Sequence, residues 1–283
     1  RGLGDVYKRQ KEIQILLGLL QRQQPCFKNG VNMDFDKTIG GYLENTGWKG
    51  RTDIGCLLNG CRQMYAATQD ERYQKFILQY VEKMSEEWEN AFSKTDVTKK
   101  INAGSAWIFA YEKTGEEKYK EYIERMKDDL MGLSRTAEGS LCEEGDHKKL
   151  MTGQHLYEVL PFYMEYETRY HNKAGYNDIV NQLTEMRSGK DAIWYVMALI
   201  DVLDHMSIEI FEHYKSLQEI FKKTIKCIPL GGDAKMQKVC MGYAILKACN
   251  IGILNPEKYL ETGRTLIDGA IAVSYTHLTL PTI

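Results

Sequence analysis

The chain has 283 residues, of which 37 are lysine or arginine and 39 are aspartate or glutamate, so its formal net charge at pH 7 is −2. Basic and acidic side chains are interleaved rather than clustered. No positive field exists to attract a polyanion, which argues against a nucleic-acid partner. The apolar run at 193–200 is much shorter than a membrane span. We therefore predict a soluble protein with no membrane partner.

The two ends differ from the rest of the chain. Residues 1–10 and 273–283 resemble translated sequencing-adapter sequence, and a genuine basic arm and a β-prone tail are the alternative. No Pro/Gly/Ser-rich linker divides residues 11–272, so we predict one large domain there. If the ends are adapter residues, we expect a final hairpin and any export signal to be missing.

The cysteines indicate a compartment. There are seven, an odd number, with no CxxC spacing, and several lie among apolar residues. This usage is typical of small core side chains in a reducing environment, so we predict a cytoplasmic protein. The histidine spacing matches no metal site either, and we predict neither a metal nor another cofactor.

Helical periodicity begins in the first half of the chain. After a predicted helix around 12–21, apolar residues recur at helical spacing over 54–65, and the pattern returns over 73–84 beyond the polar turn 68–71. Two such runs joined by a short turn predict a helical hairpin. The predicted buried face of its first helix comprises Ile54, Leu57, Leu58, Cys61 and Tyr65.

The same unit recurs along the chain. Residues 117–123 read like 71–77, and equivalent junctions fall at 175–179, 206–209 and 255–259. Ordinary helix lengths then give about five hairpins. Such a period allows an open solenoid or a closed ring, and uneven spacing with long loops favours the ring, where such loops often carry the site. The long loops are 25–49 and 135–150.

Several motifs together resemble one group of enzymes. They are Tyr65-Ala66-Ala67-Thr68, Asn102-Ala103-Gly104, Leu160-Pro161-Phe162-Tyr163, the run 194–203 and Tyr243-Ala244-Ile245-Leu246-Lys247-Ala248. In this order they resemble glycoside hydrolase families 88 and 105, the unsaturated glucuronyl and rhamnogalacturonyl hydrolases. The resemblance covers most of the chain. It implies an all-α fold, an (α/α)6 toroid of helical hairpins, truncated at its ends.

The resemblance also implies an activity. These enzymes remove a 4,5-unsaturated uronic acid from the end of a cleaved pectin, rhamnogalacturonan or glycosaminoglycan, by protonating the enol ether and adding water. That chemistry needs a proton donor beside the double bond. The two family aspartates are replaced here by Lys99 and Gln154, and two further sugar-contacting stretches by 190–194 and 234–236. The departures bear on the mechanism and leave the fold unaffected.

Catalytic candidates lie around the predicted inner helix that begins near Thr152. His155 is the candidate acid and base, because histidine titrates near neutral pH, and a structural histidine is the alternative. Gln154 beside it is the second candidate. Asp146 in the preceding loop is the third, and its neighbour His147 is a candidate sugar contact; a solvated polar loop is the alternative.

Further residues are candidates for binding the sugar. Trp48 and Asp53 would combine an apolar stacking platform with a hydroxyl acceptor, as carbohydrate sites often do; a buried indole and a helix-terminal acid are the alternative. Asn102 and Trp194 lie in the family-like motifs. Trp194 also fits an apolar helical stripe, which favours a core position.

These observations predict a carbohydrate-active, hydrolase-like protein that takes oligosaccharides carrying an unsaturated uronic acid. Lys99, Lys100 and Lys190 would suit the substrate carboxylate. Two alternatives stay open. One is a sugar-binding pseudo-enzyme without turnover, and the other is a helical-repeat scaffold that binds a peptide on its concave side.

Overall fold

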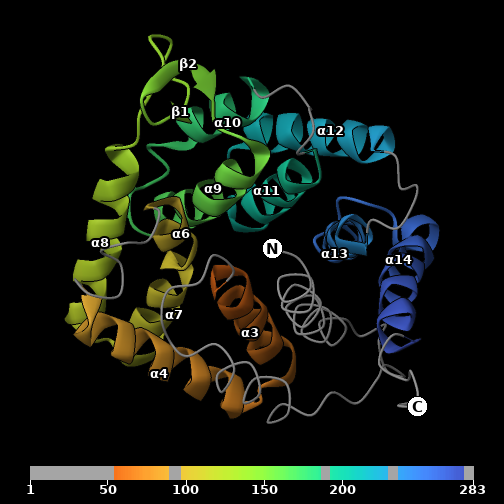
Figure 1. The fold of residues 1–283 in the computed structure, drawn as a ribbon, viewed down its shortest axis with the longest axis horizontal. Coiled ribbons are helices and arrows are strands. Elements are labelled where there is room, and N and C mark those ends of the chain that lie inside the picture. Colours follow the sequence, from red (N-terminus) through yellow and green to blue (C-terminus); the bar gives the residue numbers. More distant parts are fainter. Residues whose placement is uncertain (1–53, 89–96, 186–191, 229–234, 277–283) are drawn as a thin grey trace, which may run out of the picture. The chain divides into compact units, whose positions relative to one another are not determined.

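The computed structural model describes residues 54–88, 97–185, 192–228 and 235–276, and this part of the chain is almost wholly helical (Figure 1). A short antiparallel hairpin of strands β1 (Cys142–Glu143) and β2 (Asp146–Leu150) is the exception within these ranges. The helices are α3 (Ile54–Thr68), α4 (Glu71–Glu86), α6 (Val97–Asn102), α7 (Gly104–Thr114), α8 (Glu117–Met131), α9 (Gly153–Arg169), α10 (Tyr176–Glu185), α11 (Ala192–His205), α12 (Phe211–Cys227), α13 (Lys235–Asn250) and α14 (Pro256–Thr276).

Most helix junctions lie where the sequence predicts them. Helices α3 and α4 form the first predicted hairpin, and α14 begins at Pro256, whose missing N–H costs nothing in a first turn. The predicted junction at 206–209 lies between α11 and α12, although α12 starts slightly beyond it. The Ser207 hydroxyl accepts a hydrogen bond from the Glu209 N–H and closes a turn, so α12 begins only at Phe211.

The chain forms two compact units. The first contains α4, α13, α14 and α3 from Cys56 onward, and the second contains α6 to α12 with the β-hairpin. In the first unit α13 and α14 pack closely at Gly242. A Cβ added at this residue would lie only 2.9 Å from the Gly263 carbonyl oxygen. The predicted face of α3 is buried except at Tyr65, which is half-exposed, while Met64 is fully buried.

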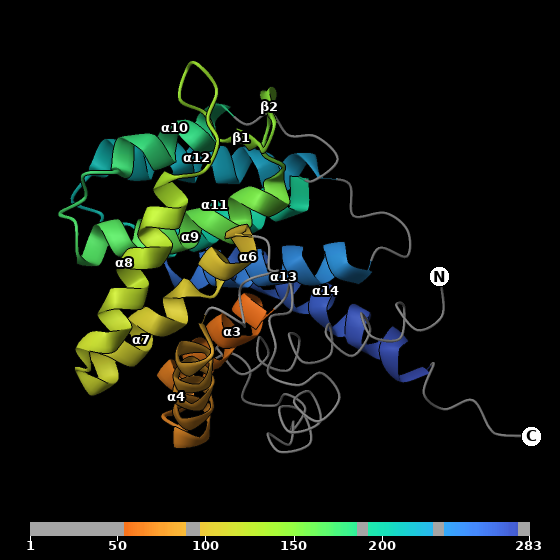
Figure 2. The same ribbon diagram turned by 60° about the vertical axis from the view of Figure 1, so that its left-hand side comes forward.

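Helix α9 is the central element of the second unit. It packs against α6, α7, α8, α10 and α11, and its close alignment with α11 is visible in two views (Figures 1 and 2). Nearly every α9 residue from Leu156 to Glu167 is buried, although several of them are polar or charged. Because buried polar groups need hydrogen-bond partners, the contacts of these residues determine the chemistry of this unit.

The predicted loop at 135–150 is partly ordered as the β-hairpin. Cys142 pairs with Leu150 and Glu143 with Asp146, and Gly145 supplies the positive φ of 79° that the tight turn needs. The hairpin leads directly into α9, since Met151 donates a backbone hydrogen bond to Leu141. The loop that precedes the candidate site is therefore anchored to the start of α9.

Some sequence predictions fall beyond the described residues. They concern the helix around 12–21, the segment 1–10 and residues 277–283. Residues 273–276 continue the last turn of α14. Within the described ranges, no helix has the length and the apolar character needed to cross a membrane.

Candidate functional site

The first turn of α9 carries two predicted site residues. Thr152 precedes the helix with extended backbone angles, and its hydroxyl accepts a hydrogen bond from the His155 N–H at 3.3 Å. This is the usual way for a threonine to satisfy a free donor at a helix start. The cap fixes where the helix begins and therefore where the half-buried side chains of Gln154 and His155 project.

His155 lies beside a carboxylate from the hairpin. Its Nδ1 is 3.4 Å from Glu143 Oε1, and the two side chains are 27 % and 25 % exposed. The pair is close enough to interact when the imidazole is protonated, but the geometry is not that of a hydrogen bond, and Nδ1 has no such partner among the described residues. Because an imidazole can both donate and accept a proton, His155 brings an acid–base group to the start of α9.

A buried carboxylate that the sequence analysis missed lies one turn further along α9. Glu158 is only 3 % exposed. The Thr98 hydroxyl donates to its Oε2 at 2.5 Å, and the Gln154 side-chain amide donates to its Oε1 at 3.0 Å. An acidic residue four positions after Gln154, in a run that is otherwise apolar up to Phe162, is a signal that could have identified it.

Asn102 and Trp194 occupy packed positions. Asn102 is 5 % exposed, its Oδ1 has no hydrogen-bond partner among the described residues, and a Cβ on Gly55 would lie only 1.8 Å from that oxygen. The half-buried Trp194 ring lies 5.4 Å from the Tyr157 ring, centroid to centroid, between α11 and α9. The contact of Trp194 supports its packing role, and none of these contacts joins either residue to Gln154 or His155.

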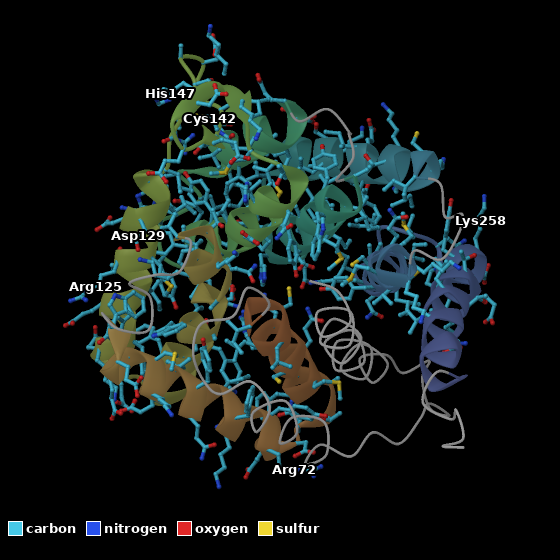
Figure 3. The ribbon with its side chains drawn as sticks, viewed as in Figure 1. Arg72, Arg125, Asp129, Cys142, His147 and Lys258 are labelled. Carbon is cyan, nitrogen blue, oxygen red and sulfur yellow. The ribbon has the colours of Figure 1, made fainter. Side chains whose placement is uncertain are left out.

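Asp146 and His147 belong to the exposed strand β2. The Asp146 carboxylate accepts a hydrogen bond from the Lys148 N–H within its own turn. His147 Nδ1 lies 3.1 Å from the Arg135 carbonyl oxygen and 3.7 Å from Cys142 Sγ, and Figure 3 shows His147 and Cys142 on the same hairpin. These contacts connect both candidates to the hairpin and, within the described residues, not to His155.

The lysines differ in their contacts. Lys100 forms an ion pair with Asp129 of α8 at 2.5 Å and lies over the Trp88 ring, 5.6 Å from its centroid, so its ammonium group is already neutralised. Lys99 is half-buried, and no described residue forms an ion pair with it. Lys190, Trp48 and Asp53 lie outside the described residues.

The described residues offer no metal centre. Among them, no three His, Cys, Asp or Glu side chains gather closely enough to hold a metal ion. The described cysteines are all free thiols, and Cys26 lies outside the described part of the chain. The chemistry that remains available at the start of α9 is that of imidazole, carboxylate and amide groups.

A match to a family model places the protein among the glycoside hydrolases, whose substrates are carbohydrates. The profile described as Glycosyl Hydrolase Family 88 matches residues 42–192, which is more than half of the chain, and the chain belongs to this family. A solved structure of a family 105 glycoside hydrolase from C. acetobutylicum ATCC 824 matches with a TM-score of 0.69 at 18 % sequence identity, covering 83 % of this chain and 81 % of that one. The predicted family resemblance and its all-α fold are thereby confirmed.

Proposed function

We propose that the protein removes a terminal 4,5-unsaturated uronic acid from an oligosaccharide, with His155 as the acid and base. Membership of family 88 supports the carbohydrate substrate. The single observation that supports this catalytic role is the placement of His155 beside Glu143 at the start of α9, next to Gln154. The pairing supplies a proton donor in a chain that lacks an aspartate at 99 and 154, where the family resemblance expects one.

The chemistry requires two proton transfers, one from the imidazolium to the substrate and one from water back to the imidazole. The His155 imidazolium donates a proton to the ring carbon of the enol ether, which leaves a cation stabilised by the ring oxygen. Water adds to that cation, and its released proton returns to the neutral imidazole. The hydrated ring then opens and releases the remaining sugar.

Other residues of the proposed site have weaker support. Gln154 is half-buried in the same helical turn and would contact the sugar. Asp146 was predicted as catalytic, and its carboxylate accepts a hydrogen bond from the Lys148 N–H within the hairpin. We keep as proposed sugar contacts Trp48, Asp53, Asn102, His147, Lys190 and Trp194.

The test follows the loss of enol-ether absorbance from unsaturated disaccharides. We expect His155→Ala to slow this reaction by roughly 100-fold, the usual contribution of a general acid. The matched control is His213→Ala, because His213 is a partly exposed histidine whose ring contacts Asn177 on α10. If His155→Ala and His213→Ala react as fast as the wild type, the catalytic role of His155 is wrong.

Glu143→Gln tests the pairing itself. The substitution keeps the size of the side chain and removes the charge that lies 3.4 Å from His155 Nδ1, so turnover of the unsaturated disaccharide should fall. Glu144→Gln is the control, because Glu144 is exposed and follows Glu143 in the sequence. Unchanged turnover in Glu143→Gln would remove the support for the pair.

A pseudo-enzyme that binds the sugar without turnover is the second candidate. It is favoured by the burial of Glu158, since the carboxyl group on this stretch of α9 is only 3 % exposed and already accepts two hydrogen bonds. Calorimetric binding of an unsaturated disaccharide with no turnover over a broad panel of substrates would support this candidate and exclude the hydrolase.

A further inference from the structure

We propose that Glu158 is a positioning residue that determines which atom of the Gln154 amide is presented to the sugar. The inference rests on the proposed function, because it takes the first turn of α9 as part of the sugar site. The carboxylate turns the amide nitrogen inward and leaves the amide oxygen as an acceptor for a sugar hydroxyl group. Glu158 thus acts through Gln154 and does not need to touch the sugar.

The inward direction of the amide nitrogen follows from the chemistry of the pair. An ionised carboxylate has only acceptor atoms, so Gln154 can satisfy Glu158 only through its Nε2 hydrogens. The Nε2 to Oε1 distance is 3.0 Å, a normal hydrogen bond. The carbonyl oxygen is the other polar atom on the same planar amide carbon, and Glu158, which offers only acceptor atoms, does not engage it.

The carboxylate itself is held from α6. Thr98 is buried, and its hydroxyl donates to the second carboxylate oxygen of Glu158. One oxygen thus engages Thr98 and the other engages Gln154, so rotation of the carboxylate would break both bonds. A charged acceptor of this kind makes stronger hydrogen bonds than a neutral one. The orientation of Gln154 therefore depends on packing between α6 and α9.

The outer atom of the pair is available for a ligand. Gln154 Oε1 has no hydrogen-bond partner among the described residues, and the side chain is half-buried in the same turn as His155. A carbonyl oxygen accepts hydrogen bonds from hydroxyl groups and gains nothing from a carboxylate. The sugar face that contacts Gln154 is accordingly a hydroxyl face, and the uronate carboxylate lies elsewhere in the site.

A double-mutant cycle tests this dependence. Glu158→Met removes the acceptor at similar size, and Gln154→Leu removes the amide. Each substitution should raise the calorimetric Kd for an unsaturated disaccharide about tenfold. Where there is turnover, KM should rise by a similar factor with little change in kcat. The double variant should be no weaker than either single variant, since both changes remove the same interaction. Additive losses would overturn the inference.

A swap variant separates positioning from simple support of the fold. Gln154→Glu combined with Glu158→Gln keeps the net charge, the hydrogen bond between the two positions and the acceptor for Thr98. It presents a carboxylate oxygen outward, which still accepts a sugar hydroxyl. We expect disaccharide binding within threefold of the wild type, against the tenfold loss in Glu158→Met. If the swap is as weak as Glu158→Met while both have wild-type urea midpoints, the inference is wrong.

The outcomes also separate this inference from the proposed function. If the wild-type protein binds the disaccharide without turning it over, the proposed hydrolase activity is wrong. The double-mutant cycle measured on Kd still tests the role of Glu158 in that case. Wild-type turnover that depends on His155, together with additive losses at Glu158 and Gln154, contradicts only the positioning role. Absence of both turnover and binding contradicts both.

Discussion

Arg135 and Asp178 form a bidentate ion pair that joins the segment before β1 to α10. Arg135 Nη1 donates to Asp178 Oδ1 at 2.9 Å and Nη2 donates to Oδ2 at 2.8 Å. Gln182 and Tyr163 donate to the same carboxylate. The segment that contains Arg135 leads into the hairpin that carries Glu143. The Arg135–Asp178 pair therefore helps to hold Glu143 beside His155, although neither Arg135 nor Asp178 takes part in the proposed chemistry.

Asp178→Asn should therefore reduce the free energy of unfolding by about 1–2 kcal/mol, a value reduced for the partial exposure of the pair. Urea unfolding followed by circular dichroism measures the loss. Glu138→Gln is the control, because Glu138 is an exposed carboxylate in the same segment. Equal midpoints for Asp178→Asn and Glu138→Gln would contradict the role of the pair.

The same pair predicts a pH dependence. Burial raises the pKa of Asp178, but the hydrogen bonds from Arg135 and Gln182 and the charge of Arg135 outweigh it, and the pKa is lower than usual. A carboxylate whose pKa is lowered by folding stabilises the folded state at pH values above the ordinary aspartate pKa. This stabilisation is lost as the pH falls through the lowered pKa of the folded protein. The urea midpoint should fall in acid, and that fall should be smaller in Asp178→Asn.

Gly55→Ala should be strongly destabilising. Its Cβ would lie 1.8 Å from Asn102 Oδ1 and 2.7 Å from the Asn102 carbonyl oxygen, so backbone and side chain would both have to move. Overpacking of this kind costs about 1–3 kcal/mol or more. The control is Gly132→Ala, where the nearest atoms are at 3.5 Å and φ is −79°. Asn102→Ala should recover part of the loss, which thermal melting of the double variant would show.

Thr152→Ala should cost about 1 kcal/mol, because the N-cap hydrogen bond to the His155 N–H is lost. Thr152→Ser keeps the hydroxyl and should retain wild-type stability. If the cap also fixes the position of His155, the alanine variant should lose turnover or sugar binding and the serine variant should not. A stability loss shared equally by both variants would exclude the cap as its cause.

Thiol labelling should distinguish the cysteines by burial. Cys227 is exposed and Cys56 is partly exposed, whereas burial protects Cys61 and raises the pKa of its thiol. In a Cys26→Ser background, a thiol reagent should label Cys227 first, and Cys227→Ser should remove that fast phase. Unfolding in urea should make all the thiols react. Fast labelling of Cys61 in the folded protein would contradict its buried position.

Much of the helical structure could be predicted because it depends on local spacing. Apolar residues three and four apart identified the face of α3, and turn residues identified the starts of α4, α8 and α14. The junction at 206–209 did not define the first residue of α12, since a serine that caps a helix and one that closes a turn look the same in sequence. The hairpin within 135–150 was missed because its strands are too short for a pattern.

The candidate site could be predicted only in part. His155 and Gln154 were identified from their place in a family-like motif, and the sequence placed them on the correct helix. Asp146 was grouped with them because it is near in sequence, yet its hydrogen bond stays within the exposed hairpin.

The sequence alone determined the helical class of this protein and its family, because amphipathic spacing and motif order are written along the chain. Only the tertiary structure brought Thr98 to Glu158 across 60 residues and Glu143 to His155 across the hairpin. Those contacts depend on the packing of α6 and the β-hairpin against α9. Whether a glutamate is a solvated charge or an internal acceptor is decided by the neighbours that packing supplies, and no local pattern specifies them.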